Sequence, residues 1–528
     1  MIEPLPNATY GDGPDVPPLT ETCMRIARGN DVPTGSSIWR LPRLVLLLAA
    51  MWMSATVLAQ SSSGEADGRN GAQRTSYRVI NLGPGTIATY PDINAAGQVA
   101  FSMVNGGRIS AFFHDGATVK NIGSLGGGIT YANDLNEAGQ IAGTSLNEHG
   151  VENAFVWSAG GGMLDIRAEP GRGRSYGWAI NNRGVVTGSF GDSARPFRWS
   201  IGSGVEDLGV TPAFQQPSGR VLNDAGLIAG VTTIDDEFTR VFAWTRGSGL
   251  VDIDTLGSVE SSPVAVGAGG EVAGNRLASW DDGGDRPFLW TRATGMVDLG
   301  IGRGTTAWVN AMTPGLHIAG GIGFADGRQR AMSWTRRGGM RELGTLGGRT
   351  SVARGVNAKG QIVGFAEDKA GAMRAFVWSA AGGMLDLNRL VRRVPPTLVL
   401  EHAMAINDRG EIVASSNAGL VLLRPDRGHE SGHTVGPLVA PRTVEVGAPL
   451  QASVSFVDGD RVGTRGVDWS WGDGSSAPAR RIDERGGVAS ARASHSFAAP
   501  GLYTVAATVV GRDGRRTVVS QDVEVTAP

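Results

Sequence analysis

The stretch that decides the fold begins Ser351-Val-Ala-Arg-Gly-Val-Asn-Ala-Lys-Gly-Gln-Ile-Val-Gly364, continues with Arg374-Ala-Phe-Val-Trp378 and ends with Gly383-Met-Leu-Asp-Leu387. It is the clearest copy of a block that recurs eight times between Tyr77 and Pro425. Residues in the position of Trp378 lie 42 to 46 residues apart from one copy to the next. A repeat of this period is typical of stacked structural units, so it predicts one continuous architecture.

Each copy shows three landmarks. The first is Asn-x-x-Gly before a short apolar run that ends in a second Gly, and Asn followed by Gly between apolar runs is a hairpin signal. The Asn positions are Asn94, Asn136, Asn181, Asn223, Asn357 and Asn407, with Gly267 and Thr313 in the two degraded copies. The second landmark is Ala-Phe-x-Trp, with His114 and Leu423 in the Trp position of the first and last copies. The third is an Asp before Leu or Ile.

These landmarks divide each copy into four short runs, none of which is long enough for a helix. Four strands in about 44 residues match one blade of a β-propeller. We expect the second strand to end at the second Gly. The last copy lacks a fourth strand, and Tyr77–Gly83 at the start of the array supplies one. A terminal strand that completes the last blade would leave no exposed edge, so we predict an eight-bladed β-propeller. A linear β-solenoid is the alternative.

The Trp column has two interpretations. Aromatic rings can stack on sugars, but a Trp at one fixed strand position of each unit favours a core between blades. We therefore predict structural roles for Trp157, Trp199, Trp244, Trp290, Trp334 and Trp378. The Asp of the third landmark is interpreted as a local hydrogen-bond device, since catalysis does not need a copy in most units.

The N-terminus predicts export. Basic residues precede an apolar run from Leu44 to Leu58, and Val57 and Ala59 occupy the small-residue cleavage positions of a secretory signal. A membrane anchor is the alternative, although the run is shorter than the roughly 20 residues of a span. Translation from Met1 or from Met24 fits the pattern equally.

The organisation expected from these features has five parts. They are an N-terminal extension and signal peptide (1–59), a disordered leader (60–76), the propeller (77–425), a linker (426–440) and a C-terminal module (441–528). After cleavage we expect no membrane span, a secreted, periplasmic or cell-surface location, and a monomer. The net charge of −2 favours no nucleic-acid partner. The one cysteine, Cys23, precedes the predicted cleavage site.

The C-terminal module has long alternating strands and predicts an Ig-like β-sandwich. Its Trp471-Gly-Asp-Gly474, His495-Ser-Phe497 and Pro500-Gly-Leu-Tyr-Thr-Val505 closely resemble the signatures of the PKD (polycystic kidney disease) domain family. The resemblance implies an extracellular spacer or a contact module without chemistry of its own. Trp471 is expected in its core and Gly472–Gly474 in a tight turn.

The 44-residue unit resembles the HAF repeat, a repeat of bacterial extracellular proteins with no established activity. The resemblance lies in Leu343–Gly348, Val356–Gly364 and Ala375–Trp378. The His that gives the family its name is absent, because Arg374 stands there. Because this His is missing, a catalytic role for the His of the tripeptide is not expected.

No catalytic motif or cofactor site stands out in the sequence. The His residues form no metal-ligand spacing, and no phosphate loop or nucleophile elbow is present. Carboxylates gather in the predicted loops between the second and third strands. They predict either solvated hairpin tips or a calcium site, for which the weak candidates are Asp281, Asp282, Asp285 and, in the C-terminal module, Asp473.

Two functions remain open at this point. The first is a secreted bacterial binding or adhesion protein that contacts an extracellular protein or polysaccharide. The alternative is a secreted polysaccharide lyase or hydrolase with its site at the propeller channel. A pair of acid/base groups converging on the channel mouth, with perturbed pKa values, would favour the enzyme.

Overall fold

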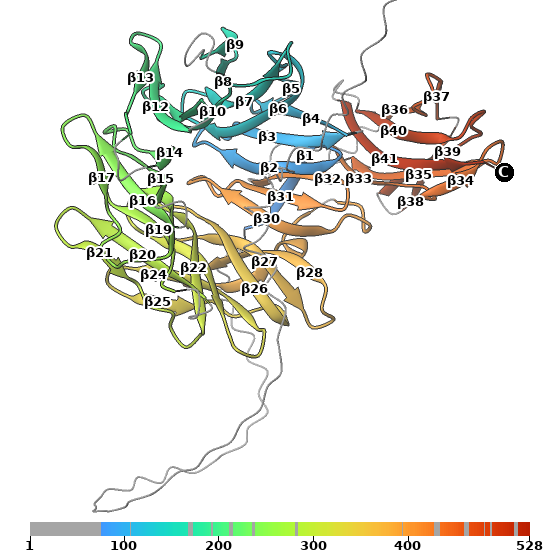
Figure 1. Ribbon diagram of the computed structural model, residues 1–528. Helices are drawn as coiled ribbons and strands as arrows, with labels where there is room; N and C mark the ends of the chain where they lie inside the picture. Colours follow the sequence, from blue (N-terminus) through green and yellow to red (C-terminus); the bar gives the residue numbers. More distant parts are fainter. Residues whose placement is uncertain are drawn as a thin grey trace, which may run out of the picture. The chain divides into compact units, whose positions relative to one another are not determined.

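The structure is a computed structural model that describes residues 75–527 except 106, 167–172, 192–193, 211–214, 235–237, 280–283, 393, 427–432, 459–463, 480, 486–487 and 512–515. The predicted signal peptide and most of the predicted leader lie outside the described residues. Within them the regular elements are β-strands, apart from one 3-10 turn, η2 (Leu387–Arg389) (Figure 1). The fold is therefore all-β, as predicted. In this part of the chain no helix is long and apolar enough to cross a membrane.

Most of these strands fall into groups of four, which we number unit 1 to unit 8. Unit 1 holds β2 (Thr86–Ile93), β3 (Val99–Asn105), β4 (Arg108–His114) and β5 (Val119–Asn121). Unit 2 holds β6 (Gly126–Leu135), β7 (Ile141–Asn147), β8 (Glu152–Ser158) and β9 (Gly162–Asp165). Unit 3 holds β10 (Ser175–Ile180), β11 (Val186–Phe190), β12 (Arg195–Ser200) and β13 (Gly204–Asp207). Unit 4 holds β14 (Gln215–Leu222), β15 (Ile228–Ile234), β16 (Phe238–Thr245) and β17 (Gly249–Asp252).

The later units repeat the arrangement. Unit 5 holds β18 (Glu260–Val266), β19 (Val272–Leu277), β20 (Asp285–Thr291) and β21 (Gly295–Asp298). Unit 6 holds β22 (Thr306–Met312), β23 (Ile318–Gly323), β24 (Gln329–Thr335) and β25 (Gly339–Glu342). Unit 7 holds β26 (Gly347–Val356), β27 (Ile362–Asp368), β28 (Met373–Ser379) and β29 (Gly383–Asp386). Unit 8 holds β30 (Leu400–Ile406), β31 (Ile412–Ser416), β32 (Gly419–Pro425) and β1 (Tyr77–Gly83).

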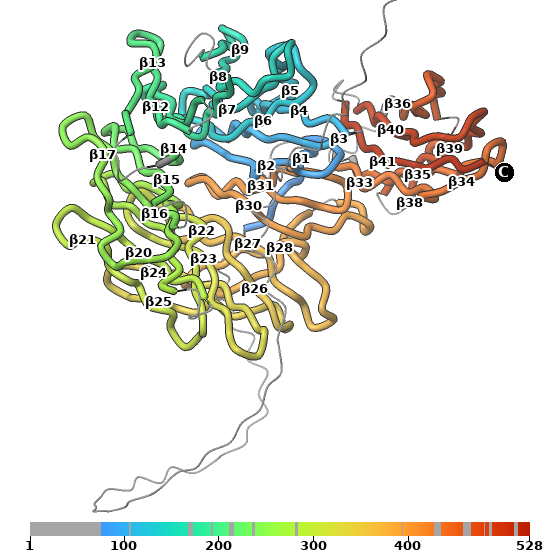
Figure 2. Tube along the Cα trace, viewed as in Figure 1, coloured from blue at the N-terminus to red at the C-terminus, as the bar shows by residue number. Residues whose placement is uncertain are grey.

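Unit 8 joins the two ends of the array. Its strand order is β1-β32-β31-β30, and β1 pairs antiparallel with β32 so that Val79 lies opposite Leu423. The predicted pairing of Tyr77–Gly83 with the last copy is confirmed. The trace in Figure 2 shows β1, in blue, beside the orange strands of this unit.

The first strands of neighbouring units lie against one another. The succession runs β2, β6, β10, β14, β18, β22, β26 and β30, and β30 in turn contacts β2 (Figure 1). In each unit the first strand pairs with the second strand. In units 2 and 5 it also pairs in parallel at one position with the third strand of the preceding unit, β6 with β4 and β18 with β16.

The Asn of the Asn-x-x-Gly turn links units through its side chain. Within its own turn the amide oxygen accepts main-chain N–H groups, as in Asn181 with Val185 at 3.0 Å. The Nδ2 group donates to the main-chain oxygen of the corresponding residue in the next unit. These bonds run Asn94 to Asn136, Asn136 to Asn181, Asn181 to Asn223, Asn223 to Gly267, Asn357 to Asn407 and Asn407 to Asn94, at 2.9–3.1 Å. The turn was predicted, whereas the bond to the next unit was not.

The second Gly of the repeat has a different role from the one predicted. We expected the second strand to end there, but β27 continues past Gly364 to Asp368. A Cβ on Gly364 would lie 2.0 Å from the main-chain oxygen of Val352, and one on Gly188 would lie 1.8 Å from that of Tyr176. The Gly is therefore required because the first strand approaches it too closely for any side chain.

The C-terminal region forms two further sheets. One has the order β33 (His433–Val439), β35 (Leu450–Asp458), β39 (Val488–His495) and β38 (Ile482–Arg485). The other has the order β34 (Thr443–Glu445), β41 (Arg516–Thr526), β40 (Gly501–Gly511), β36 (Thr464–Ser470) and β37 (Ser476–Pro478). A shared apolar core that includes Trp469, Trp471 and Phe497 holds this region together.

One expected boundary in this region is wrong. Residues 433–439, which we expected to belong to the linker 426–440, form β33 and pair with β35. Buried Val435 and Leu438 belong to the core of the sandwich, so this strand is held by hydrophobic burial. The Pro and Gly residues around it gave the sequence its linker-like character.

Candidate functional site

The first strand of every unit carries an irregularity at one fixed place. Three residues before the Asn position, the register skips a residue, which then faces no partner on the second strand. A bulge of this kind re-aims the side chain of the extra residue and is common beside functional sites. The residues at this position are Pro91, Asn133, Trp178, Arg220, Val264, Asn310, Arg354 and Met404. We call them the bulge residues. They differ from unit to unit while the backbone around them repeats.

Two of the bulge residues hold neighbouring units together. Asn133 donates from Nδ2 to the main-chain oxygen of Gly177 at 2.7 Å, and Asn310 donates to that of Ala353 at 2.8 Å. These side chains have main-chain partners in the next unit, so their contribution is structural.

A second pair of bulge residues forms a cation–π contact. The guanidinium carbon of Arg220 lies 4.3 Å from the ring centre of Trp178 in the preceding unit. The ring of Tyr176 stacks on Trp178 with 6.1 Å between ring centres. Aromatic faces and a guanidinium therefore lie together on β10 and β14.

The remaining charged bulge residue, Arg354, lies between rings from two other strands. Its guanidinium carbon is 5.3 Å from the ring centre of Tyr90 and 5.6 Å from that of Phe365. The His402 ring meets Phe365 edge-on at 4.8 Å. Burial is the main cause that lowers the pKa of His402, and the positive charge of Arg354 lowers it further. The cluster draws residues from units 1, 7 and 8.

A carboxyl pair lies near the ends of β2 and β6. Asp92 and Asp134 share a hydrogen bond, and burial raises the pKa of both, with the charge of Asp92 raising that of Asp134 further. Their oxygens also accept main-chain N–H groups from Ile93, Leu135 and Ile180 at 2.7–3.3 Å. Because these amides belong to units 1, 2 and 3, the pair braces neighbouring units.

The Trp column lies in apolar clusters that combine residues of neighbouring units, with two degrees of burial. The Trp side chains at 157, 199, 244 and 378 are buried, whereas Trp290 and Trp334 in units 5 and 6 are half-buried. His114, in the Trp position of unit 1, is buried, and burial together with the nearby Arg424 lowers its pKa to about 4. Arg424 also forms an ion pair with buried Glu411 at 2.8 Å.

The Asp at the end of the fourth strand makes two kinds of bond. One oxygen of Asp252 accepts the N–H of Asp254 at 2.8 Å, and the other pairs with Arg240 at 3.3 Å. Asp298 makes the same pattern with Gly300 and Arg276. This carboxylate therefore shapes the chain after the strand and ties it to an inner strand.

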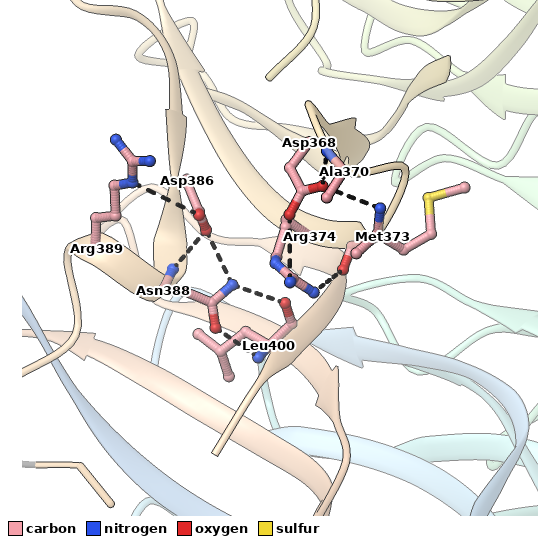
Figure 3. A network of polar contacts seen from close by, with 9 residues as sticks. Asp368, Ala370, Met373, Arg374, Asp386, Asn388, Arg389 and Leu400 are labelled. Atoms are coloured by element: carbon pink, nitrogen blue, oxygen red, sulfur yellow. Dashed lines mark hydrogen bonds and ion pairs between the residues drawn. The ribbon is translucent and has the colours of Figure 1, made fainter. Parts of the chain in front are cut away.

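Figure 3 shows how this device is used in unit 7. Asp386 accepts the N–H of Asn388 at 2.9 Å and lies 4.0 Å from Arg389. The Asn388 side chain in turn bonds both the N–H and the oxygen of Leu400, at 2.7 and 2.9 Å, and so positions the start of β30. In the neighbouring turn Asp368 pairs with Arg374 at 3.2 Å. Asp368 and Asp386 therefore both have hydrogen-bond or ion-pair partners within the protein.

The four weak calcium candidates lie in different settings. Asp281 and Asp282 lie outside the described residues. Asp285 lies in β20, where burial and the nearby charge of Glu260 raise its pKa. In the part of the chain that the structure describes, no three His, Cys, Asp or Glu side chains are grouped as metal ligands.

The fourth candidate, Asp473, is bonded within the C-terminal sandwich. One oxygen accepts the Ser475 hydroxyl at 2.5 Å and the other lies 2.7 Å from Nε2 of His495. The Ser475 bond and the His495 contact lower the pKa of Asp473 to about 2. The serine hydroxyl donates to the carboxylate instead of to the histidine, so the three residues do not form a nucleophile–base pair.

An aromatic stack surrounds this carboxylate. Trp469 stacks on Trp471 at 5.7 Å, Trp471 stacks on His495 at 4.8 Å, and Phe497 stacks on Tyr503 at 4.4 Å. The positive φ of Gly472 and Gly474 forms the turn after Trp471. These are the positions of the signature residues, and the segment matches the family model described as PKD domain. Residues 435–527 are a PKD domain. Its Ig-like sandwich accounts for both C-terminal sheets, and the PKD domain begins within the strand β33 that the sequence left in a linker.

The comparisons with other proteins give fainter likenesses. Virginiamycin B lyase from Staphylococcus aureus matches at 10% identity and a TM-score of 0.34, over 66% of this chain and 98% of that one. TolB from Acinetobacter baumannii matches at 18% identity and a TM-score of 0.29, over 39% and 51%. The extracellular domain of the two component system protein BT3049 from B. thetaiotaomicron matches at 11% identity and a TM-score of 0.28, over 84% and 68%. At these scores the likenesses carry no argument about function. No curated protein matches the chain.

The bulge residues were missed by sequence reasoning, which expected local function in the loops between the second and third strands, at the channel mouth and in the C-terminal module. The signal was present in the sequence, because the position three residues before the Asn changes its residue type, while in units 3 to 8 both of its neighbours stay small or apolar. Its meaning depends on the register shift, which no single copy of the repeat reveals.

Proposed function

We propose that this chain is an exported, non-enzymatic binding protein. Its eight HAF-like units form a closed eight-bladed β-propeller, the PKD domain serves as a spacer or a second contact, and a signal peptide directs export. The pairing of β1 with β32, the contact of β30 with β2 and the Asn407 to Asn94 bond support closure of the ring.

The observation that carries the binding function is the variation of the bulge residues. The repeating positions hold the units together, whereas the bulge position holds Trp, Arg, Val or Met on otherwise equivalent strands. A surface that varies over a repeated scaffold is the usual design of a recognition surface. The partner is an extracellular polysaccharide or protein.

A binding screen of the full chain tests this proposal. The probes are a glycan array and a panel of extracellular proteins, and the bulge variant combines Trp178→Ala, Arg220→Gln and Arg354→Gln. A matched control variant changes exposed apolar residues of outer strands, namely Leu164→Ser, Val251→Ser and Val297→Ser. The proposal expects the bulge variant to lose binding and the control to keep it, with both melting cooperatively. The proposal would be overturned if the outer-strand control lost binding while the bulge variant kept it.

A polysaccharide-acting enzyme is the second candidate, and the carboxyl pair Asp92–Asp134 is the observation that favours it. Paired carboxyls with raised pKa values are common in active sites. However, glycosidases hold their two carboxyls about 5–9.5 Å apart, whereas these two share a hydrogen bond. Products released from a polysaccharide by the wild type and abolished by Asp134→Asn would make the enzyme the better description.

A further inference from the structure

Tyr90 stands out among the aromatic side chains of the described residues because it alone is mostly exposed, at 60%. It belongs to the irregular stretch of β2 in unit 1, beside the bulge residue Pro91. An aromatic face of this kind offers a stacking surface at low conformational cost.

The Arg354 side chain opposite Tyr90 lacks an acidic partner. No carboxylate of the described residues lies within ion-pair distance of Arg354, whereas Arg240, Arg276 and Arg424 each have one. Arg354 is half-buried between the rings of Tyr90 and Phe365. A partly desolvated cation without a counter-ion is unfavourable, and the N–H groups of its guanidinium can bind an anionic ligand.

His402 completes the surroundings of this cation. Its ring packs on Phe365, and its Nδ1 lies 3.3 Å from the hydroxyl of Ser415. The charged groups that act on His402 are Glu401, which raises its pKa, and Arg354, which lowers it. With burial dominant, the imidazole stays neutral near pH 7 and contributes hydrogen bonding instead of charge.

We propose that Tyr90, Arg354 and His402 form a subsite for a carboxylate-bearing sugar of an extracellular polysaccharide. Arg354 would hold the carboxylate through its planar fork of N–H groups, and the exposed Tyr90 ring would pack against the sugar. The inference rests on the proposed binding function and adds the class of ligand. It also requires units 7, 8 and 1 to be neighbours, since each contributes one of the three residues.

The test measures binding of the full chain to polygalacturonate by calorimetry at low and high salt. Dextran sulfate supplies sulfate as the anionic group without any carboxylate, dextran is the neutral polysaccharide, and polyglutamate represents an acidic protein. The variants are Arg354→Gln, Arg354→Lys and Tyr90→Ala, and the matched control is Arg303→Ala, an exposed arginine paired with Glu342.

The proposal expects wild-type binding to polygalacturonate that weakens with salt, a loss of at least tenfold in Arg354→Gln and a clear loss in Tyr90→Ala. Arg354→Lys should recover only part of the affinity, and Arg303→Ala should bind like the wild type. Unchanged thermal melting would show that each variant is folded.

Three outcomes would overturn it: equal binding by Arg354→Gln and wild type, preference for dextran sulfate or polyglutamate over polygalacturonate, or binding to dextran alone. In the last case the proposed binding function survives without this subsite. Absence of binding to every polysaccharide and protein offered would instead remove the proposed function itself.

Discussion

Units 5 and 6 differ from the other six units at the turn between the first and second strands. Six turns carry an Asn whose side chain bonds the next unit, but Gly267 and Thr313 occupy this place in units 5 and 6 and make no such bond. Main-chain bonds keep the same turn, as Leu316 N–H to the oxygen of Thr313 at 2.9 Å shows. The turn itself therefore does not need the Asn.

The same two units differ in other respects. Leu316 replaces the turn glycine and adopts φ +65°, a conformation that costs a non-glycine residue about 1–2 kcal/mol. Asn275 and Asn310 bond main-chain atoms of units 6 and 7 from other positions. The comparison teaches that the link between units is needed at each junction, whereas the residue that supplies it can change.

The largest expected difference concerns the Trp column. Trp378→Ala should lower the free energy of unfolding by about 4 kcal/mol, because a buried indole is replaced by a cavity. Trp334→Ala in unit 6 should cost about 2 kcal/mol, since that ring is half-buried. Denaturant unfolding measures both. Equal losses would show that units 5 and 6 are packed no differently from the rest.

Removing the side chain at the Asn position should destabilise a unit that has the Asn more than a unit that lacks it. Asn181→Ala removes three hydrogen bonds, namely those to the N–H groups of Arg183 and buried Val185 and the one to the oxygen of Asn223, which keeps only the Gly226 N–H, and should cost about 3 kcal/mol. Thr313→Ala removes only the acceptor for His317 N–H and should cost about 1 kcal/mol. Denaturant unfolding of the two variants is compared. If Thr313→Ala cost as much as Asn181→Ala, the distinction between the two kinds of junction would fail.

We predict that the junction between units 8 and 1 makes the free energy of unfolding depend on pH. It keeps the Asn link but carries buried His114 in the Trp position, with a pKa lowered from 6.5 to about 4. A histidine whose folded pKa is lowered stabilises the fold above its unfolded pKa. That stability is lost as the pH falls from 6.5 to 4, by up to about 3 kcal/mol.

The pH measurement is made as a difference between variants, because burial also lowers the pKa of His317 and His402. His114→Leu, which places the Leu of the unit 8 position in unit 1, should remove about 3 kcal/mol of the change in unfolding free energy between pH 7 and pH 4. An identical pH profile for the variant and the wild type would contradict this account of the junction.

The smallest expected effect is an increase in stability. Thr313→Asn should place an Nδ2 group where it can bond the oxygen of Asn357 and should stabilise the protein by about 1 kcal/mol. Thr313→Asp is the matched control, since it can accept the N–H of His317 but cannot donate to the next unit. A gain in unfolding temperature for Asn over Asp supports the link, and no difference between the two would count against it.

Much of the fold could be predicted from the sequence because the same pattern recurs in eight copies, so each copy supports the assignment made for the others. The sequence predicted the all-β class, the hairpin at Asn-x-x-Gly and the pairing of Tyr77–Gly83 with the last copy. The prediction that a strand ends at the second Gly was wrong. A glycine is required both in a tight turn and where another strand passes very close, and the sequence does not distinguish the two cases. It also left β33 in a linker, because the Pro and Gly residues there hid a buried strand.

The candidate site could be predicted only in part. The motifs identified the PKD domain. The variation between copies was expected to mark function, but the bulge position was not singled out. Residues as distant along the chain as Tyr90 and Arg354 come together because unit 8 lies between units 7 and 1.

The sequence by itself determined the periodic features: strand spacing, turn chemistry, the Trp column and the signature of the C-terminal domain. Each of these depends on neighbouring residues, so local spacing is enough to specify it. The tertiary structure alone decided which side chain bonds the next unit, why the second Gly is needed and which rings enclose Arg354. These features depend on how closely separate strands approach, and that distance is set by packing between units.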